Sequence, residues 1–188
     1  MTLEEALNLF RSTGALLDGH FILRSGLHSR QFFQCALALQ QMPLVERFGK
    51  ALADQVRALE PHTVIAPAMG GLVIGQEVAR QLGCRFIFAE KEENRLVLRR
   101  GFQISPGERF LVVEDVVTKG GRVQETLAIV RERSGVPLAV AMMVDRSDGS
   151  LDLAVPTFSL IRLHIETFAA DQLPSDLVSI PAVKPGSK

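Results

Sequence analysis

Two adjacent carboxylates followed by a glycine-containing turn are the residues of this sequence best able to carry out chemistry. Glu114 and Asp115 end an apolar run, and after two valines comes the segment 118–122, Thr-Lys-Gly-Gly-Arg. Carboxylates accept hydrogen bonds from the vicinal hydroxyls of a sugar. A turn that enters a helix presents backbone N–H groups to an anion, and glycines let the backbone approach it closely. The pattern therefore predicts a site for a ribose 5-phosphate.

The same segment matches neither of two common nucleotide-binding loops. It contains no GxxxxGK of a Walker A motif and no GxGxxG of a dinucleotide-binding fold. In an open parallel sheet, ligands bind beyond the carboxyl ends of the strands, and the turn after residue 115 must lie there. The alternative is a strand, a turn and a helix whose acids only face solvent.

Short apolar strands alternate with helices through the middle of the chain. The expected strands are 63–66, 85–89, 109–113, 138–144 and 158–165, and the expected helices are 71–82 and 120–134. Strands that are apolar throughout and are joined by helices indicate a parallel sheet covered on both faces. We therefore expect an α/β fold with a Rossmann-like core.

The first 60 residues follow a different pattern. Thr2 caps a helix that runs to about Ser12, the runs 21–24 and 31–35 form a plausible hairpin, and a second helix spans 43–59. We expect a single domain in three parts: an N-terminal hood over residues 1–60, an α/β core over 61–165, and a tail over 166–188. The charged segment 90–107 is expected to be a long loop or flexible ribbon, as functional loops often are.

Composition limits the class of protein. The 188 residues are 47% hydrophobic and 22% charged with a formal net charge of zero, which fits one globular domain and not a protein built mainly to bind nucleic acid or acidic membrane. The two cysteines, Cys35 and Cys84, lack metal-site spacing and are expected to be free thiols. No signal-peptide pattern or membrane-spanning apolar stretch is present, so a cytoplasmic protein is expected.

The stretch 110–122 resembles, almost position by position, the signature that binds PRPP (5-phosphoribosyl 1-diphosphate) in type I phosphoribosyltransferases. The resemblance implies that Glu114 and Asp115 hold the ribose hydroxyls, with Asp115 also catalytic. It implies that further PRPP contacts come from the loop itself, namely Val116, Val117, Thr118, Lys119, Gly120, Gly121 and Arg122. Lys119 is bulkier than the small residue usual at its position.

A second stretch, Phe21 to Phe33, resembles the N-terminal signature FxLxSGxxSxxF of the orotate phosphoribosyltransferases. The resemblance implies that Phe32 and Phe33 line the orotate pocket and that Arg24 contacts PRPP, where many members have lysine. The alternative is an ordinary hairpin whose phenylalanines lie in the core.

Arg146 follows the strand 138–144 and is expected at the carboxyl edge of the sheet. In the family, the arginine of an equivalent Asp-Arg pair contacts orotate, so Arg146 is implied to bind the carboxylate of the base, with Thr118 beside it. The alternative is a surface arginine paired with Asp145.

Two loops depart from the family pattern. The pyrophosphate loop often reads PAYKG where this chain has Pro-Ala-Met69-Gly70-Gly, so Met69 and Gly70 are implied to contact PRPP without a lysine. Lys91 matches the catalytic, PRPP-binding lysine of the mobile loop, whereas Glu90 replaces an arginine and the later Lys and His are missing. Three arginines either replace the lost charge or belong to a solvated ribbon: Arg95, Arg99 and Arg100.

The family resemblance implies a type I phosphoribosyltransferase fold with a small hood, to which the tail can add. It implies transfer of ribose 5-phosphate from PRPP to orotate, giving orotidine 5′-monophosphate and pyrophosphate, in pyrimidine synthesis. Mg²⁺ is expected to be carried by PRPP and not by a direct protein site. A homodimer with shared active sites is implied, with no nucleic-acid or membrane partner. Alternatives are a phosphoribosyltransferase for a purine or another base, and a PRPP-sensing regulator that binds nucleic acid.

Overall fold

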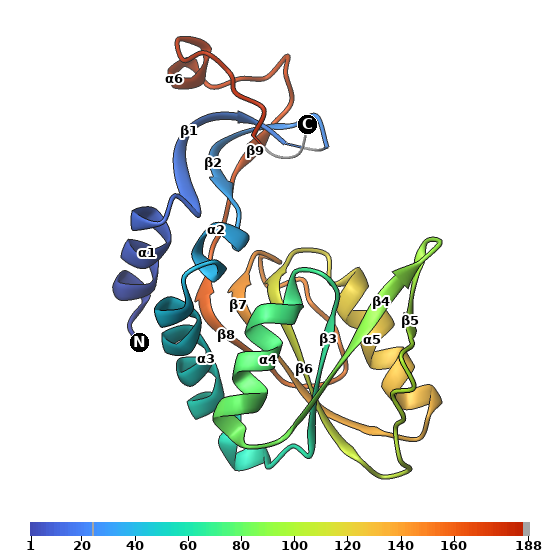
Figure 1. Ribbon diagram of the computed structural model, residues 1–188. Coiled ribbons are helices and arrows are strands. Elements are labelled where there is room, and N and C mark those ends of the chain that lie inside the picture. Colours follow the sequence, from blue (N-terminus) through green and yellow to red (C-terminus); the bar gives the residue numbers. More distant parts are fainter. Residues whose placement is uncertain (24, 186–188) are drawn as a thin grey trace.

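The centre of the molecule is a six-stranded sheet, seen in a computed structural model that describes residues 1–23 and 25–185 (Figure 1). The strands lie in the order β5-β4-β3-β6-β7-β8. All neighbours are parallel except β5, which is antiparallel to β4. The strands are β3 (Thr63–Pro67), β4 (Arg85–Glu92), β5 (Arg95–Leu98), β6 (Arg109–Val117), β7 (Val136–Asp145) and β8 (Thr157–Arg162). The predicted α/β fold, a Rossmann-like parallel sheet with flanking helices, is confirmed.

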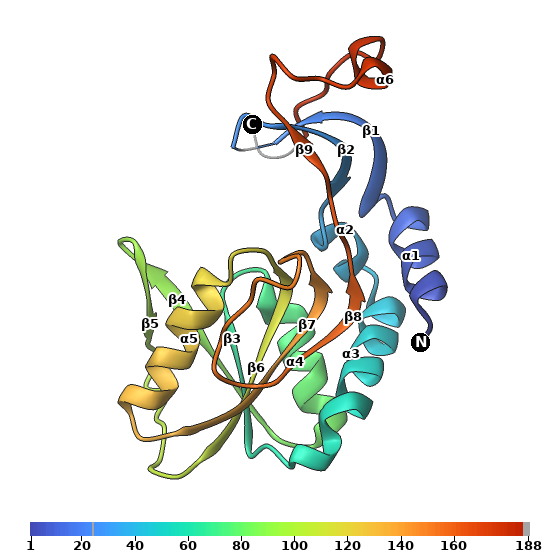
Figure 2. The same cartoon turned by 180° about the vertical axis from the view of Figure 1, so that it is seen from behind.

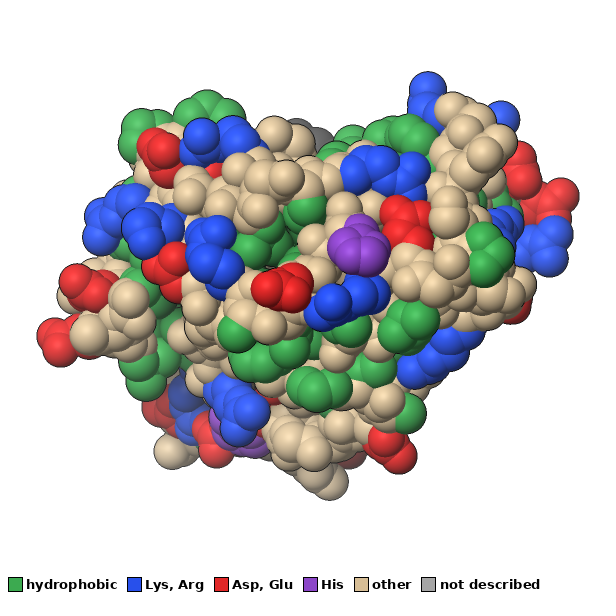
Figure 3. All heavy atoms as spheres, turned by 90° about the horizontal axis from the view of Figure 1, so that it is seen from below, with side chains coloured by type: hydrophobic (Ala, Val, Ile, Leu, Met, Phe, Trp, Pro, Cys, Tyr) green, Lys and Arg blue, Asp and Glu red, His purple; other side chains and the backbone are tan. Residues whose placement is uncertain are grey.

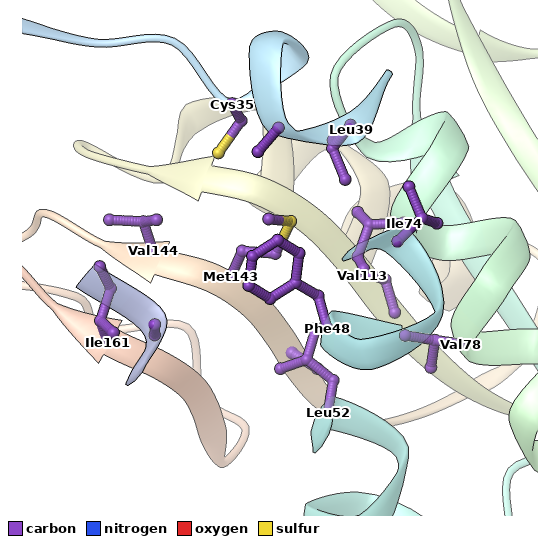
Figure 4. Packing of buried hydrophobic residues seen from close by; sticks show 14 of the residues in the cluster. Cys35, Leu39, Phe48, Leu52, Ile74, Val78, Val113, Met143, Val144 and Ile161 are labelled. Atoms are coloured by element: carbon purple, nitrogen blue, oxygen red, sulfur yellow. The ribbon is translucent and has the colours of Figure 1, made fainter. Parts of the chain in front are cut away.

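Helices cover both faces of this sheet. α3 (Met42–Val56) and α4 (Gly71–Leu82) lie on one face and α5 (Gly121–Glu132) lies on the other (Figures 1 and 2). Alternate residues of β6 enter the two cores, with Val113 on the α3 and α4 side and Val112 on the α5 side. Figure 4 shows side chains of α3 and α4 gathered with those of β6 and β7. Burial on both faces explains why β6 is apolar up to its two acids.

A second, three-stranded sheet forms the hood. It consists of β1 (Leu16–Ile22), β2 (His28–Phe33) and β9 (Thr167–Phe168), all antiparallel, and stands beyond the carboxyl edge of the core sheet in Figure 1. α1 (Leu3–Ser12) precedes it with Thr2 in a capping box, and α6 (Ser175–Val178) lies at its far end. Arg30 bonds the carboxylates of Glu166 and Asp176 at 2.6 and 2.8 Å. N-terminal and C-terminal segments therefore build the hood together.

Three segments differ from the sequence-based expectation, and one is the hood hairpin, whose strands are Leu16–Ile22 and His28–Phe33 instead of 21–24 and 31–35. The expected loop 90–107 begins as a hairpin, because β4 continues to Glu92 and pairs with β5. The apolar residue Leu96 is 5% exposed and packs with Ala89 and Ile129, which stabilises this pairing. The third difference is also in the N-terminal part, where the short helix α2 (Ala36–Leu39) was not expected and the predicted helix 43–59 ends as a 3-10 turn at Arg57–Leu59.

Candidate active site

The connection from β6 to α5 forms a small cradle at the carboxyl edge of the sheet. A cavity of about 140 Å³ is lined by Glu114 and by the continuous segment 116–123. Gly120 has φ +75°, and a Cβ there would lie 2.8 Å from a Leu151 methyl carbon. Thr118 and Lys119 are exposed, and α5 begins at Gly121. The predicted phosphate loop thus has the shape of an anion site at a helix N-terminus, and only glycine fits at position 120.

The two acids at the end of β6 point to opposite faces of the strand. Glu114 is 7% exposed and lines the cavity, and its Oε1 accepts a 3.0 Å hydrogen bond from the N–H of Asp115. The Asp115 Oδ1 accepts a 2.7 Å bond from the N–H of Val116. Burial, and then the neighbouring charge of Asp115, raise the pKa of Glu114 to about 9. Glu114 is therefore protonated at neutral pH when no ligand is bound, and it can donate a hydrogen bond.

The loop after β3 lies directly against these acids. A Cβ on Gly70 would meet the Asp115 carboxylate at 2.5 Å, and a Cβ on Gly71 would meet the Val113 carbonyl oxygen at 2.8 Å. Met69, between the end of β3 and these glycines, is 80% exposed. The structure therefore brings the predicted pyrophosphate loop and the predicted ribose acids together, and the absence of side chains at Gly70 and Gly71 allows it.

Arg146 lies beside the cradle, and no residue within 1–23 or 25–185 forms an ion pair with it. Its N–H donates to the carbonyl oxygen of Val117 at 2.8 Å, and its buried Nε has no hydrogen-bond partner among the described residues. Burial lowers the pKa of Arg146. Asp145 instead accepts bonds from the N–H and Oγ of Ser147, at 2.9 and 2.6 Å, and lies 3.6 Å from Arg162. The alternative pairing of Arg146 with Asp145 is therefore not what the structure shows, and Arg146 is free to meet an anion.

The hood reaches this site through Cys35, whose Sγ lies 4.0 Å from the Asp115 carbonyl oxygen. Phe32 comes three residues earlier and so lies within roughly 11 Å of it along the chain. Phe33 is 7% exposed, with its ring 4.9 Å from that of Phe10. Phe33 is thus a core residue of the hood in this structure, whereas Phe32 is only partly buried. Contact of either ring with orotate stays a prediction, and Arg24 lies outside the described residues.

Two acids of β4 pair with arginines that follow β5 directly. Arg100 bonds Glu90 at 2.7 Å and Arg99 lies 3.2 Å from Glu92, so neither is a free cation. Lys91 is exposed, and strand alternation places it on the α5 side together with Ala89.

Arg122, expected at the phosphate, lines the cradle, and its guanidinium also reaches toward this hairpin; its contact with PRPP stays a prediction. It bonds Glu125 at 3.0 Å and reaches the Asn94 carbonyl oxygen at 3.5 Å. Sequence reasoning did not identify Glu125. Its only signal was the spacing of three residues from Arg122, which is common for surface pairs on a helix.

Further features of the described residues concern possible metal ligands, membrane-spanning helices, cysteines and surface charge. No group of three or more His, Cys, Asp or Glu side chains in the described ranges is placed to hold a metal ion. Within the same ranges, no helix has the length and apolarity to cross a bilayer. Cys35 and Cys84 are free thiols. On the face seen from below Figure 1, basic and acidic side chains are interspersed (Figure 3).

Comparison with known proteins shows which protein family this chain is similar to. The model of the phosphoribosyl transferase domain matches residues 36–170. The chain is 47% identical, over all of its length and 99% of the relative, to an orotate phosphoribosyltransferase of Pelotomaculum thermopropionicum. It is 44% identical, over all of its length and 97% of the relative, to one of Rhizorhabdus wittichii.

Solved structures show the same fold. The orotate phosphoribosyltransferase of Aeropyrum pernix matches with a TM-score of 0.70 at 23% identity, covering 83% of this chain and 92% of that one. The adenine phosphoribosyltransferase of Thermoanaerobacter pseudethanolicus matches with a TM-score of 0.62 at 17% identity, covering 71% and 88%.

Proposed function

This chain belongs to the orotate phosphoribosyltransferases, pentosyltransferases of pyrimidine biosynthesis that act on PRPP and orotate, and from that premise we propose which residues perform the transfer. The observation that carries the proposal is the contact between the Gly70 loop and Asp115, beside the cradle of the β6–α5 connection. One edge of the sheet thereby offers adjacent places for a 5-phosphate, a ribose and a pyrophosphate.

The 5-phosphate is proposed to lie in the cradle. Backbone N–H groups of residues 118–121 and the positive end of the α5 dipole face it. Asp115 is proposed to accept hydrogen bonds from the ribose hydroxyls, and protonated Glu114 to donate to one of them. Backbone groups of Met69 and Gly70 are proposed to bind the pyrophosphate, with Lys91 as the nearby charge.

Mg²⁺ is proposed to accompany PRPP. The donor set fits it, because the carboxylates at the end of β6 are hard oxygen ligands and Mg²⁺ prefers substrate phosphates, water and one or two carboxylates to a protein cage. When bound, the ion neutralises charge on the pyrophosphate. The ion would be held by oxygens of PRPP and by water, next to Asp115 and Glu114, which themselves hold the ribose hydroxyls.

Orotate is proposed to be recognised by its carboxylate. The Arg146 guanidinium, whose Nε has no partner among the described residues, supplies a planar fork that matches a carboxylate with two parallel hydrogen bonds. The backbone bond from Arg146 to Val117 places the Arg146 backbone beside the residue that precedes Thr118. Phe32 is proposed to cover one face of the base.

The reaction follows from this placement. The bond from ribose C1 to the pyrophosphate oxygen breaks, and that oxygen keeps the electron pair. Asp115 and the cradle hold the ribose while positive charge develops at C1, and Lys91 stabilises the charge gained by the leaving oxygen. Orotate N1, held by Arg146, then forms the bond to C1 from the opposite face, and the N1–H proton passes to the departing pyrophosphate or to water. No covalent intermediate on the protein is needed.

A direct test is orotate turnover, followed by absorbance with PRPP and Mg²⁺, in wild type and in Arg146→Ala. Loss of the guanidinium is expected to raise the KM for orotate roughly 100-fold while the KM for PRPP changes little. Arg162→Ala, which removes a neighbouring exposed arginine, is the control. Activity with adenine or uracil but not orotate would refute the base assignment.

The remaining proposals concern assembly and location. We propose a homodimer, supported by exposed apolar side chains at adjoining elements, namely Leu37 of α2, Met42 of α3 and Val73 of α4. We also propose a cytoplasmic enzyme without nucleic-acid or membrane partners, supported by zero net charge and the mixed charges of Figure 3. Light scattering of the purified protein tests the dimer, and a monomer would contradict it.

A further inference from the structure

The β4–β5 hairpin is docked on helix α5 and not extended freely into solvent. Leu96 of β5 is buried with Ala89 of β4 and Ile129 of α5. Past Leu96 toward the turn, residues 91–95 are all exposed. The end of the hairpin that carries Lys91 therefore has few apolar contacts of its own, and its position depends on whatever holds Leu96.

A carboxylate from α5 holds the outer edge of the hairpin. β5 is the last strand of the sheet, so its outward N–H groups have no neighbouring strand. The outward N–H of Leu96 donates to Glu125 Oε2 at 2.8 Å. Glu125 is itself held by Arg122 Nη1, at 3.1 and 3.0 Å from its two oxygens. A charged acceptor on a backbone N–H makes a stronger hydrogen bond than a neutral one.

The same turn of α5 makes a second contact with the hairpin. Arg122 Nη1 lies 3.5 Å from the carbonyl oxygen of Asn94, in the turn between the two strands. Helix α5 begins at Gly121, directly after the phosphate cradle. The hairpin is therefore attached to the helical turn that leaves the cradle, through Asn94 and Leu96.

Leu96 is also the direct cross-strand partner of Lys91. Directly opposite residues of an antiparallel pair have side chains on the same face and Cβ atoms about 4.5–5.5 Å apart. A displacement of Leu96 along or away from α5 therefore displaces Lys91 by a similar amount. Glu125 holds the residue opposite the lysine without touching the lysine.

We propose that Glu125 is a positioning residue that sets the distance between Lys91 and the phosphate cradle by holding the Leu96 N–H. The inference rests on the proposed contact of Lys91 with the pyrophosphate of PRPP. Glu125 contacts no reacting atom, so its whole effect on turnover passes through Lys91.

The experiment is a double-mutant cycle of Glu125→Ala and Lys91→Ala, with kcat and KM measured for PRPP in the full enzyme. Glu125→Ala is expected to lower kcat/KM about tenfold in the wild-type background, as loss of one charge-assisted hydrogen bond would. In the Lys91→Ala background the same change is expected to have no further effect. Glu132→Ala, an exposed acid at the other end of α5, is the control and should match wild type.

The outcomes separate the proposed role of Lys91 from the proposed role of Glu125. If Lys91→Ala alone leaves turnover unchanged, the proposed role of Lys91 fails. If Lys91→Ala lowers turnover but Glu125→Ala has no effect, or has an equal effect in both backgrounds, the positioning role of Glu125 fails. An equal effect in both backgrounds would mean that Glu125 stabilises the fold or acts through Arg122.

A second variant separates positioning from general stability. Glu125→Gln keeps an oxygen able to accept from Leu96, and it is expected to recover more than half of the lost activity on a logarithmic scale. Hydrogen exchange at Leu96 is expected to be faster in Glu125→Ala than in Glu125→Gln or wild type. Unchanged exchange in Glu125→Ala would overturn the proposal even if the activity fell.

Discussion

The β6–α5 connection and the β4–β5 hairpin both serve the same edge of the sheet, but they are built in opposite ways. The connection is shaped by backbone: Gly120 adopts a left-handed φ, and Gly70 and Gly71 leave room for the acids. The hairpin is held by side chains, with Leu96 buried on α5 and its N–H bonded to Glu125. In the part of the site that is shaped by backbone, a substitution at one of a few glycines is expected to abolish most of the activity. In the part that is held by side chains, each substitution is expected to remove only a fraction of it.

The largest expected effect comes from placing a side chain in the backbone-built part. In Gly70→Ala the new Cβ would meet the Asp115 carboxylate at 2.5 Å, so either the loop or the acid must move. A displacement of about 1 Å at reacting groups lowers kcat/KM roughly 100-fold. Steady-state kinetics with PRPP measure it, and circular dichroism checks that the fold is retained. Near-normal kinetics in a folded variant would remove the contrast between the two regions.

A smaller effect is expected from Lys91→Ala, which removes the functional side chain of the hairpin. Because Lys91 is exposed, its loss should leave the melting temperature unchanged. Loss of its charge from the leaving pyrophosphate should lower kcat/KM roughly 30-fold. Lys50→Ala, an exposed lysine of α3 paired with Asp54, is the control. A fall in stability that matched the fall in activity would show the lysine to be structural.

The base side of the site offers a third test, in which a side chain shapes a backbone turn. The Oγ and N–H of Ser147 both donate to Asp145, which fixes the turn directly after Arg146. In Ser147→Ala one of these two bonds is lost. We expect the KM for orotate to rise roughly fivefold, with the KM for PRPP unchanged. Equal changes in both constants would place Ser147 in general stability.

The smallest effect is thermal and concerns Glu114. Its pKa is raised from 4.5 to about 9 in the folded protein, so the folded state binds a proton that the unfolded state releases between these values. Stability is therefore full below about pH 4.5 and is lost as the pH rises toward 9. In Glu114→Gln this loss is absent, so between pH 6 and 9 its melting temperature should fall roughly 10 °C less than that of wild type. Parallel melting curves would show that Glu114 is already ionised.

The same contrast explains what could be predicted from the sequence. The cradle was predictable because its geometry is local: strand, acids, glycine turn and helix follow one another within 110–122. The sheet was predictable because strands buried on both faces are apolar throughout. The family signature around Phe32 and the Asp-Arg pair indicated orotate as the base, and the contacts of these residues with it stay predictions.

Contacts between distant segments could not be predicted in this way. Leu96 and Glu125 are 29 residues apart, and no local pattern joins them. The burial of Phe33 depends on Phe10, a residue of another element. The hairpin was expected to be a loop because its charges suggest solvent, whereas some of its acids are paired, as Glu90 of β4 is with Arg100, two residues past β5.

The pairing of the hood with the tail has a consequence for how the protein is made. His20 Nδ1 lies 2.8 Å from the Ile180 carbonyl oxygen, across 160 residues of chain, and Phe21 pairs with Val183. The segment synthesised first therefore waits for residues near position 180 to leave the ribosome, while the intervening α/β core can fold earlier. A nascent chain stalled before that point would carry a folded core with an incomplete hood. Strands β1 and β2 of that hood would then be exposed to proteases and chaperones.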